Sequence, residues 1–353
     1  MKIGFQIRRN EVIFMKRSRM EKQRDLWIDT LRGIAALGVV TAHCLTIFPS
    51  IGVRASGMGK IFVSLFFVLS GFYAFDDVES IIGSNKQILQ YWIKRFVNII
   101  PLFWVCLWAG YFLKEYPAQS TIRCMFLMEG IGHFWYVPVI MGFYFLVPLV
   151  GVLIKNTTGK KRVLIYIVIV CVMEILFPFF RCQENCIIVF YYIPSFMIGS
   201  IVKEFNKRDI EQKNIMCDVA CLLILACFVT IVPGIRELLF GIEPDRYLQN
   251  KIIFMSMGWG MFLFLAPRTK WLIEVLNTGN ILARISVVGY EIYLIHYLLI
   301  QKFLLMGVEP WKNVGLTLLL TGVLSIPAFL CIHKPLNDWM NRRCQKKEKS
   351  QVV

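Results

Sequence analysis

The stretch Trp27-Ile-Asp-Thr-Leu-Arg32-Gly-Ile-Ala-Ala-Leu-Gly-Val-Val-Thr-Ala-His43-Cys44 predicts an apolar helix that carries a guanidinium, Arg32, and an imidazole, His43. At 3.6 residues per turn, their spacing brings them within about 20° of each other around the helix, roughly 16 Å apart along its axis. Ionisable side chains within a membrane are costly and usually face a partner or a polar cavity. Two of them on one face predict a polar path into the bilayer.

The rest of the chain is also dominated by apolar runs. Hydrophobic residues make up 57% of the sequence and charged residues 18%, which excludes a disordered chain and argues against a soluble globular enzyme. The apolar runs are long enough to cross a bilayer as helices, so we expect an all-α integral membrane protein with about ten transmembrane helices. The predicted spans are 27–48, 58–75, 96–113, 135–154, 163–180, 187–202, 215–232, 251–266, 285–303 and 315–332.

The distribution of charge predicts the orientation. The net charge is +16, and with the N-terminus inside, the inner segments hold 28 of the 39 lysines and arginines against 9 in the outer segments, counting Lys60 and Lys251 at the outer ends of their spans. This bias fits the positive-inside rule with both termini in the cytoplasm of a multi-pass plasma-membrane protein, and it argues against a nucleic-acid partner. We therefore expect a basic arm (1–26), a membrane domain (27–332) and a basic tail (333–353), unstructured from Arg342.

His43 and Arg32 of the first helix each have two interpretations. His43 is a candidate general base acting on a hydroxyl, or a histidine hydrogen-bonded to a neighbouring helix. Arg32 is a candidate ligand for phosphate or for a thioester carbonyl, or a snorkelling anchor at the head groups. Asp29, one turn earlier, can pair with Arg32 and lower the cost of its burial.

Other candidates lie on later helices. Lys94 and Arg95, before the third span, fit contacts to the phosphates of a cytosolic cofactor, or ordinary flanking charge. A separate amphipathic helix is also expected between residues 76 and 95. In the ninth span, His296 is a candidate for the same cavity as His43. The sequence leaves open whether Cys182 and Cys186 form a disulfide.

The segment that opens the fourth span combines a histidine with two large aromatic residues. His133, Trp135 and Tyr136 fit a sugar site, in which rings stack and the imidazole orients a hydroxyl, or an interfacial aromatic belt. Four scattered histidines give no metal-ligand spacing, so no metal site is expected.

Taken in order, several of these stretches resemble the acyltransferase 3 family of integral-membrane O-acyltransferases. The stretches that carry the resemblance are Ile28 to Leu37 with His43, Leu65 to Phe72, Lys94-Arg95 to Pro101, His133 to Tyr136 with Tyr144 and Pro148, and Ser286 to His296. The resemblance implies about ten transmembrane helices and transfer of an acyl group, usually acetyl, from cytosolic acyl-CoA to a sugar hydroxyl.

The resemblance also implies roles for particular residues. Arg32 and His43 match the family's essential arginine and histidine, and Arg95 matches the first arginine of a basic motif on the inner face. The chain departs from the pattern at Asn98, where many members have a second arginine, at Glu291, where glycine is common, and at His333, where glutamate is frequent.

We therefore interpret the chain as a membrane O-acetyltransferase of a surface polysaccharide or its lipid-linked precursor. Acyl-CoA is the donor substrate, and no tightly bound cofactor is expected. The expected partners are acyl-CoA, a glycan acceptor and membrane lipids. Direct transfer and an acyl-histidine relay both remain open. The rival interpretations are a transporter or flippase of a lipid-linked sugar, with Arg32, His43, Glu174 and Glu291 along its pathway, and a non-catalytic scaffold.

Overall fold

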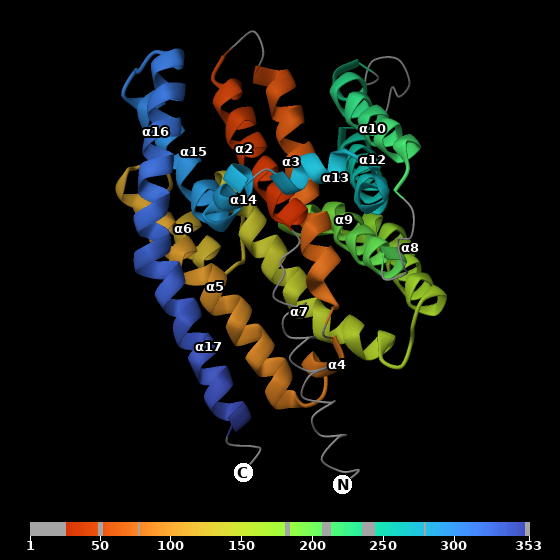
Figure 1. Cartoon of the computed structure of the whole chain (residues 1–353). Coiled ribbons are helices and arrows are strands. Elements are labelled where there is room, and N and C mark those ends of the chain that lie inside the picture. The colour runs from red at the N-terminus through yellow and green to blue at the C-terminus, as the bar shows by residue number, and fades with distance from the viewer. Residues whose placement is uncertain are drawn as a thin grey trace.

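The computed structural model describes residues 26–48, 52–76, 78–180, 184–206, 213–234, 244–278 and 280–349. All regular secondary structure in these ranges is helical, as the sequence predicts (Figure 1). The elements are α2 (Leu26–Thr46), α3 (Gly52–Ala74), α4 (Val78–Ile81), α5 (Asn85–Phe112), α6 (Ala118–Met125), η1 (Gly132–Trp135), α7 (Tyr136–Ile154), α8 (Lys160–Phe180), α9 (Glu184–Asn206), α10 (Ile215–Gly234), α12 (Pro244–Leu265), η2 (Ala266–Arg268), α13 (Leu272–Thr278), α14 (Asn280–Val287), α15 (Gly289–Leu305), α16 (Pro310–Ala328), η3 (Phe329–His333) and α17 (Lys334–Lys349).

Each of the ten apolar segments predicted from the sequence is helical over most of its length. Within the described ranges, five helical stretches are long and apolar enough to cross a membrane, and the number rises to seven if each of two bent helix pairs is one span. The five are α2, α3, α5, η1 with α7, and the stretch from α16 into α17. The chain is therefore a helical membrane protein, while the count of ten spans and the orientation of the termini stay predictions.

One predicted span, 285–303, is broken rather than straight, and a second helix bends sharply beyond the end of its predicted span, 251–266. The helix that ends at Arg268 turns by 92° into α13, and α14 meets α15 at 77°. Figure 1 shows the short helices α13 and α14 lying across the middle of the molecule, over α2. The close approach of α14 to α2 requires a glycine, because a Cβ at Gly33 would lie 2.0 Å from the carbonyl oxygen of Leu282.

Helix α5 differs from the prediction at its beginning. The expected amphipathic helix is not separate, because α5 runs without a break from Asn85 to Phe112 and carries Lys94 and Arg95 within it. Ser84 caps its N-terminus by accepting a hydrogen bond from the backbone N–H of Gln87. Pro101 lies inside this helix without ending it.

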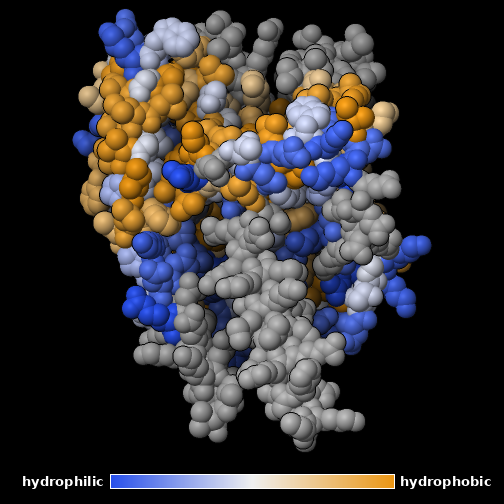
Figure 2. Space-filling model, viewed as in Figure 1, coloured by the Kyte–Doolittle hydropathy of each residue, from blue (hydrophilic) through white to orange (hydrophobic). Residues whose placement is uncertain are grey.

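The C-terminal part of the chain forms a long rod. Helix α16 passes through one turn of π-helix, η3, directly into α17, so the tail that we expected to be unstructured from Arg342 is helical as far as Lys349. The predicted boundary at 332/333 therefore falls inside this rod. Figure 2 shows an apolar surface over α16 and hydrophilic side chains below it over α17, as expected where a helix leaves the bilayer.

Helices α3 and α9 approach each other through small residues. A Cβ at Gly71 would lie 1.8 Å from the carbonyl oxygen of Phe196, and one at Gly199 would lie 1.9 Å from that of Val68. The hydroxyl of Ser200 donates to the carbonyl oxygen of Gly71 at 2.9 Å. Gly71 and Gly199 therefore allow the close packing of α3 and α9.

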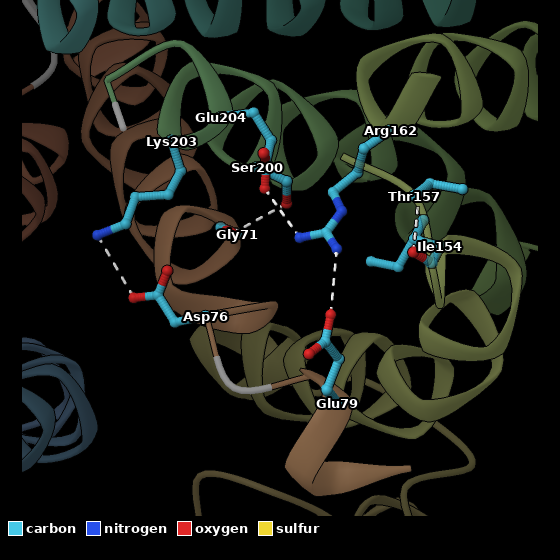
Figure 3. Close-up of polar contacts among 9 residues, drawn as sticks. All are labelled: Gly71, Asp76, Glu79, Ile154, Thr157, Arg162, Ser200, Lys203 and Glu204. Atoms are coloured by element: carbon cyan, nitrogen blue, oxygen red, sulfur yellow. Dashed lines mark hydrogen bonds and ion pairs between the residues drawn. The ribbon is translucent and has the colours of Figure 1, made fainter. Parts of the chain in front are cut away.

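A layer of ion pairs joins the ends of α3, α8 and α9 (Figure 3). The buried guanidinium of Arg162 lies 3.1 Å from Glu204 and 3.9 Å from Glu79, while Lys203 lies 3.4 Å from Asp76. Buried charges are tolerated when they are paired in this way. These pairs hold the ends of α8 and α9 to α4 and to the end of α3.

Two expectations fall outside what the structure describes. The proposed Cys182–Cys186 disulfide lies outside the described residues, as does the side chain of Glu174.

Candidate active site

Two cavities meet between α2, α3, α7 and α15. The first, here called the Arg32 cavity, has a volume of about 330 Å³, and the second, the His43 cavity, about 240 Å³. Both are lined by Val63 of α3 and Tyr293 of α15, so the two cavities adjoin there. The polar or aromatic residues of the Arg32 cavity are Arg32, Phe66, Ser70, Arg95, Asn98, Tyr136, Tyr144, Ser286, Tyr290, Tyr293 and His333. Those of the His43 cavity are His43, Lys60, His133, Trp135, Tyr191, Tyr192 and Tyr293.

Helix α2 contributes one ionisable side chain to each cavity. Arg32, near its N-terminal end, lines the first cavity, and His43, three turns further on, lines the second. The helical spacing that predicted a shared face thus also explains how one helix serves two adjoining cavities. Asp29 pairs with Arg32 at 3.0 Å, as predicted.

The Arg32 cavity has a second guanidinium. The side chain of Arg95 lies over the rings of Tyr144, 4.3 Å away, and Tyr91, 5.2 Å away. No carboxylate among the residues that the structure describes forms an ion pair with Arg95. Aromatic faces partly compensate such a cation but leave its hydrogen-bond donors available to an anion.

His43 is held by a second histidine. Its Nδ1 lies 2.8 Å from Nε2 of His296, and Nδ1 of His296 lies 2.9 Å from the carbonyl oxygen of Ile292. A carbonyl can only accept, so Nδ1 of His296 donates, and in a neutral ring its Nε2 then accepts. Nδ1 of His43 is therefore the donor between the rings, which leaves the lone pair on Nε2 of His43.

Comparison with known proteins identifies the family of the chain. A family model described as an acyltransferase domain matches residues 25–333. The chain belongs to this acyltransferase family. A viral protein named "Putative acetyltransferase ORF330", from Acidianus two-tailed virus, is 21% identical over 319 residues, which are 83% of this chain and 89% of that protein. No solved structure matches the chain.

Other predicted residues fall in different places in this acyltransferase. His296 is fully buried behind His43 and lines neither cavity. Lys94 is exposed and also lines neither, so the structure separates it from its neighbour Arg95. The Oδ1 atom of Asn98, where the family often has a second arginine, is buried on the wall of the Arg32 cavity without a hydrogen-bond partner.

The aromatic segment of the acyltransferase is divided between the cavities. Trp135 lines the His43 cavity and stacks on Tyr192 with ring centroids 5.3 Å apart, whereas Tyr136 lines the Arg32 cavity. Both residues thus line cavities, and the alternative of an interfacial belt stays a prediction. Nε2 of His133 hydrogen-bonds to the carbonyl oxygen of Leu294 at 3.0 Å, and its buried Nδ1 has no partner.

Sequence reasoning missed several wall residues of the acyltransferase. Tyr293 lies where the cavities adjoin, and its hydroxyl donates to the backbone carbonyl of His133. Tyr144 and His333 also line the Arg32 cavity. The family motifs include Tyr144 and Tyr293, but only the packing of the helices shows which side of the site they occupy. Within the described ranges, no group of three or more His, Cys, Asp or Glu is arranged to hold a metal ion.

Proposed function

We propose that this acyltransferase transfers an acyl group, typically acetyl, from acyl-CoA in the Arg32 cavity to a hydroxyl of a glycan in the His43 cavity. The observation that carries the proposal is the arrangement of the two cavities, which adjoin at Val63 and Tyr293. One has two guanidinium groups suited to phosphate or a thioester oxygen, and the other has a histidine among aromatic rings.

In the proposed mechanism, Nε2 of His43 takes the proton of the acceptor hydroxyl as its oxygen attacks the thioester carbonyl. The C–S bond then breaks, the coenzyme leaves as a thiolate, and the imidazolium returns its proton to that sulfur. Nε2 of His296 accepts a hydrogen bond from the Nδ1–H of His43, and this keeps the lone pair of the His43 ring on its Nε2. Holding two substrates against each other supplies much of the acceleration.

The walls of the His43 cavity support a carbohydrate acceptor. Trp135, Tyr191 and Tyr192 give aromatic surface against which a sugar ring can stack, and Nδ1 of His133 is a buried acceptor for a hydroxyl. We propose a cell-surface polysaccharide or lipid-linked glycan as the acceptor, and the plasma membrane as the location, where such glycans are reached.

The proposal is tested by comparing the O-acyl content of envelope glycans in cells that carry the wild-type chain, His43→Gln or no chain. Mass spectrometry should detect O-acetyl groups only with the wild type, at equal amounts of protein in the membrane. Thr41→Ala, on the exposed side of the same helix, is the matched control and should keep full modification. Full modification by His43→Gln would refute the assignment of the base.

The rival transporter interpretation predicts a different result. Purified protein in vesicles would then move a lipid-linked sugar without consuming acetyl-CoA. Release of free coenzyme A together with labelled acetyl on the glycan supports the transferase, and transport without that release supports the rival.

A further inference from the structure

A buried carboxylate and an imidazole form a pair beside the Arg32 cavity that the proposed chemistry does not use. Glu291 of α15 is fully buried, and its Oε1 lies 2.6 Å from Nδ1 of His333. The two residues are 42 positions apart and come from different helices. Burying a carboxylate is costly unless it is paired, so this contact compensates Glu291 and fixes the ring of His333.

The backbone around His333 is also unusual. Residues Phe329–His333 form a single turn of π-helix between two α-helices, α16 and α17. Single π turns inside α-helices are rare and are frequent at functional sites. Here the π turn ends at His333, whose side chain lines the Arg32 cavity rather than the lipid-facing side of the rod.

The charges of the cavity are of one sign. Arg32, Arg95 and His333 line it, and no described aspartate or glutamate does. Arg32 is paired with Asp29 and Arg95 lies between tyrosine rings, so the wall combines two permanent cations with one imidazole. A wall of this composition suits a ligand that carries several negative charges.

We propose that His333, held in place by Glu291, is a phosphate contact for the acyl donor, and that this phosphate subsite acts together with Arg95. This inference rests on the proposed function, since it assumes coenzyme A as the carrier. Nδ1 of His333 donates to Glu291 while Nε2 donates to a phosphate oxygen, which are the two hydrogen bonds of an imidazolium. A cavity of about 330 Å³ holds only part of the coenzyme, so the subsite contacts one phosphate group.

The test uses purified full-length protein and two probes, coenzyme A and pantetheine, which lacks the phosphates. His333→Gln should weaken the binding of coenzyme A about tenfold and leave that of pantetheine unchanged, because one charge-assisted hydrogen bond is lost. His333→Arg, which keeps a cation beside Glu291, should bind coenzyme A like the wild type. Leu330→Ala, exposed on the same π turn, is the matched control and should change neither affinity.

Glu291→Gln supplies a second measurement. It should also weaken the binding of coenzyme A, and the double variant Glu291→Gln/His333→Gln should be no weaker than His333→Gln alone, because the two residues act as one unit. A purely structural pair would lower the thermal stability of the variants without changing the ratio of the two affinities.

The outcomes separate this inference from the proposed function. The phosphate subsite is refuted if the wild type binds coenzyme A and His333→Gln binds it equally well. It is also refuted if the affinity of His333→Gln falls to the same extent for coenzyme A and for pantetheine. In both cases the proposal that acyl-CoA is the donor is unaffected. If the wild type itself does not bind coenzyme A, the proposed donor is refuted, and the subsite with it.

Discussion

At the scale of the residue, the contact between His43 and His296 makes a sharp prediction. His296→Ala removes the acceptor for Nδ1 of His43, so the ring can turn or take the other tautomer. We expect kcat to fall about 100-fold, with little change in the KM for the acyl donor, because the Arg32 cavity is untouched. His296→Gln offers an amide oxygen to the same N–H and should recover part of the loss. The measurement is the initial rate of transfer against donor concentration.

Thr46 gives the matched control for that experiment. Its hydroxyl donates to the backbone carbonyl of His43 at 2.6 Å and does not touch the ring, so Thr46→Val should leave kcat close to that of the wild type. Equal activity of His296→Ala and the wild type would mean that His43 needs no partner to act as the base.

The contact between His43 and His296 shows which parts of the site can be predicted from the sequence. The spacing of Arg32 and His43 on one helix follows from helical geometry, and both residues line the site. His296 is 253 positions from His43, and nothing in the sequence indicates that its ring lies behind His43 instead of on a cavity wall. Relations within one helix are predictable from periodicity, whereas relations between helices depend on packing.

At the scale of the element, the crossing of α3 and α9 predicts that Gly71 cannot be replaced. A Cβ there would lie 1.8 Å from the backbone oxygen of Phe196, which cannot move away without separating the helices. We expect Gly71→Ala to lower the free energy of unfolding by about 1–3 kcal/mol. Gly142 of α7 has nothing within 4 Å of its would-be Cβ, so Gly142→Ala should be neutral or slightly stabilising.

Unfolding of the purified variants in detergent would measure this difference. Equal stability of Gly71→Ala and Gly142→Ala would contradict the close helix crossing. Gly71 therefore packs against α9, while its neighbour Ser70 lines the Arg32 cavity.

The bent helices could not be predicted in the same way. The apolar run through Val287, Val288 and Gly289 continues across the 77° bend, so hydropathy indicates one straight span. The bend becomes visible only when α14 is seen packed on Gly33 of α2, which is a tertiary contact. It places Ser286 and Tyr290, on either side of the bend, on the same cavity wall.

At the scale of the whole molecule, the count of spans decides where the C-terminus lies. Five to seven spans are apparent in the described residues, and α8, α9 and α10 are further helices of 20 to 23 residues. If each bent helix pair is one span, there are three crossings between the turn after α7 and the C-terminus without these helices and six with them. An even number puts that turn and the C-terminus on the same side, and an odd number puts them on opposite sides.

We predict six crossings, with both positions in the cytoplasm, because the turn at Lys155–Arg162 and the tail from Lys334 are rich in lysine and arginine. Green fluorescent protein fused after Val353 should therefore fluoresce, and alkaline phosphatase fused there should be inactive. A reporter inserted at Thr157 should give the same result, whereas one at Lys114, between α5 and α6, should give the opposite. An active phosphatase after Val353, with the Thr157 reporter still cytoplasmic, would show an odd number of crossings, so that at least one of α8, α9, α10 and the two bent helix pairs does not cross the membrane.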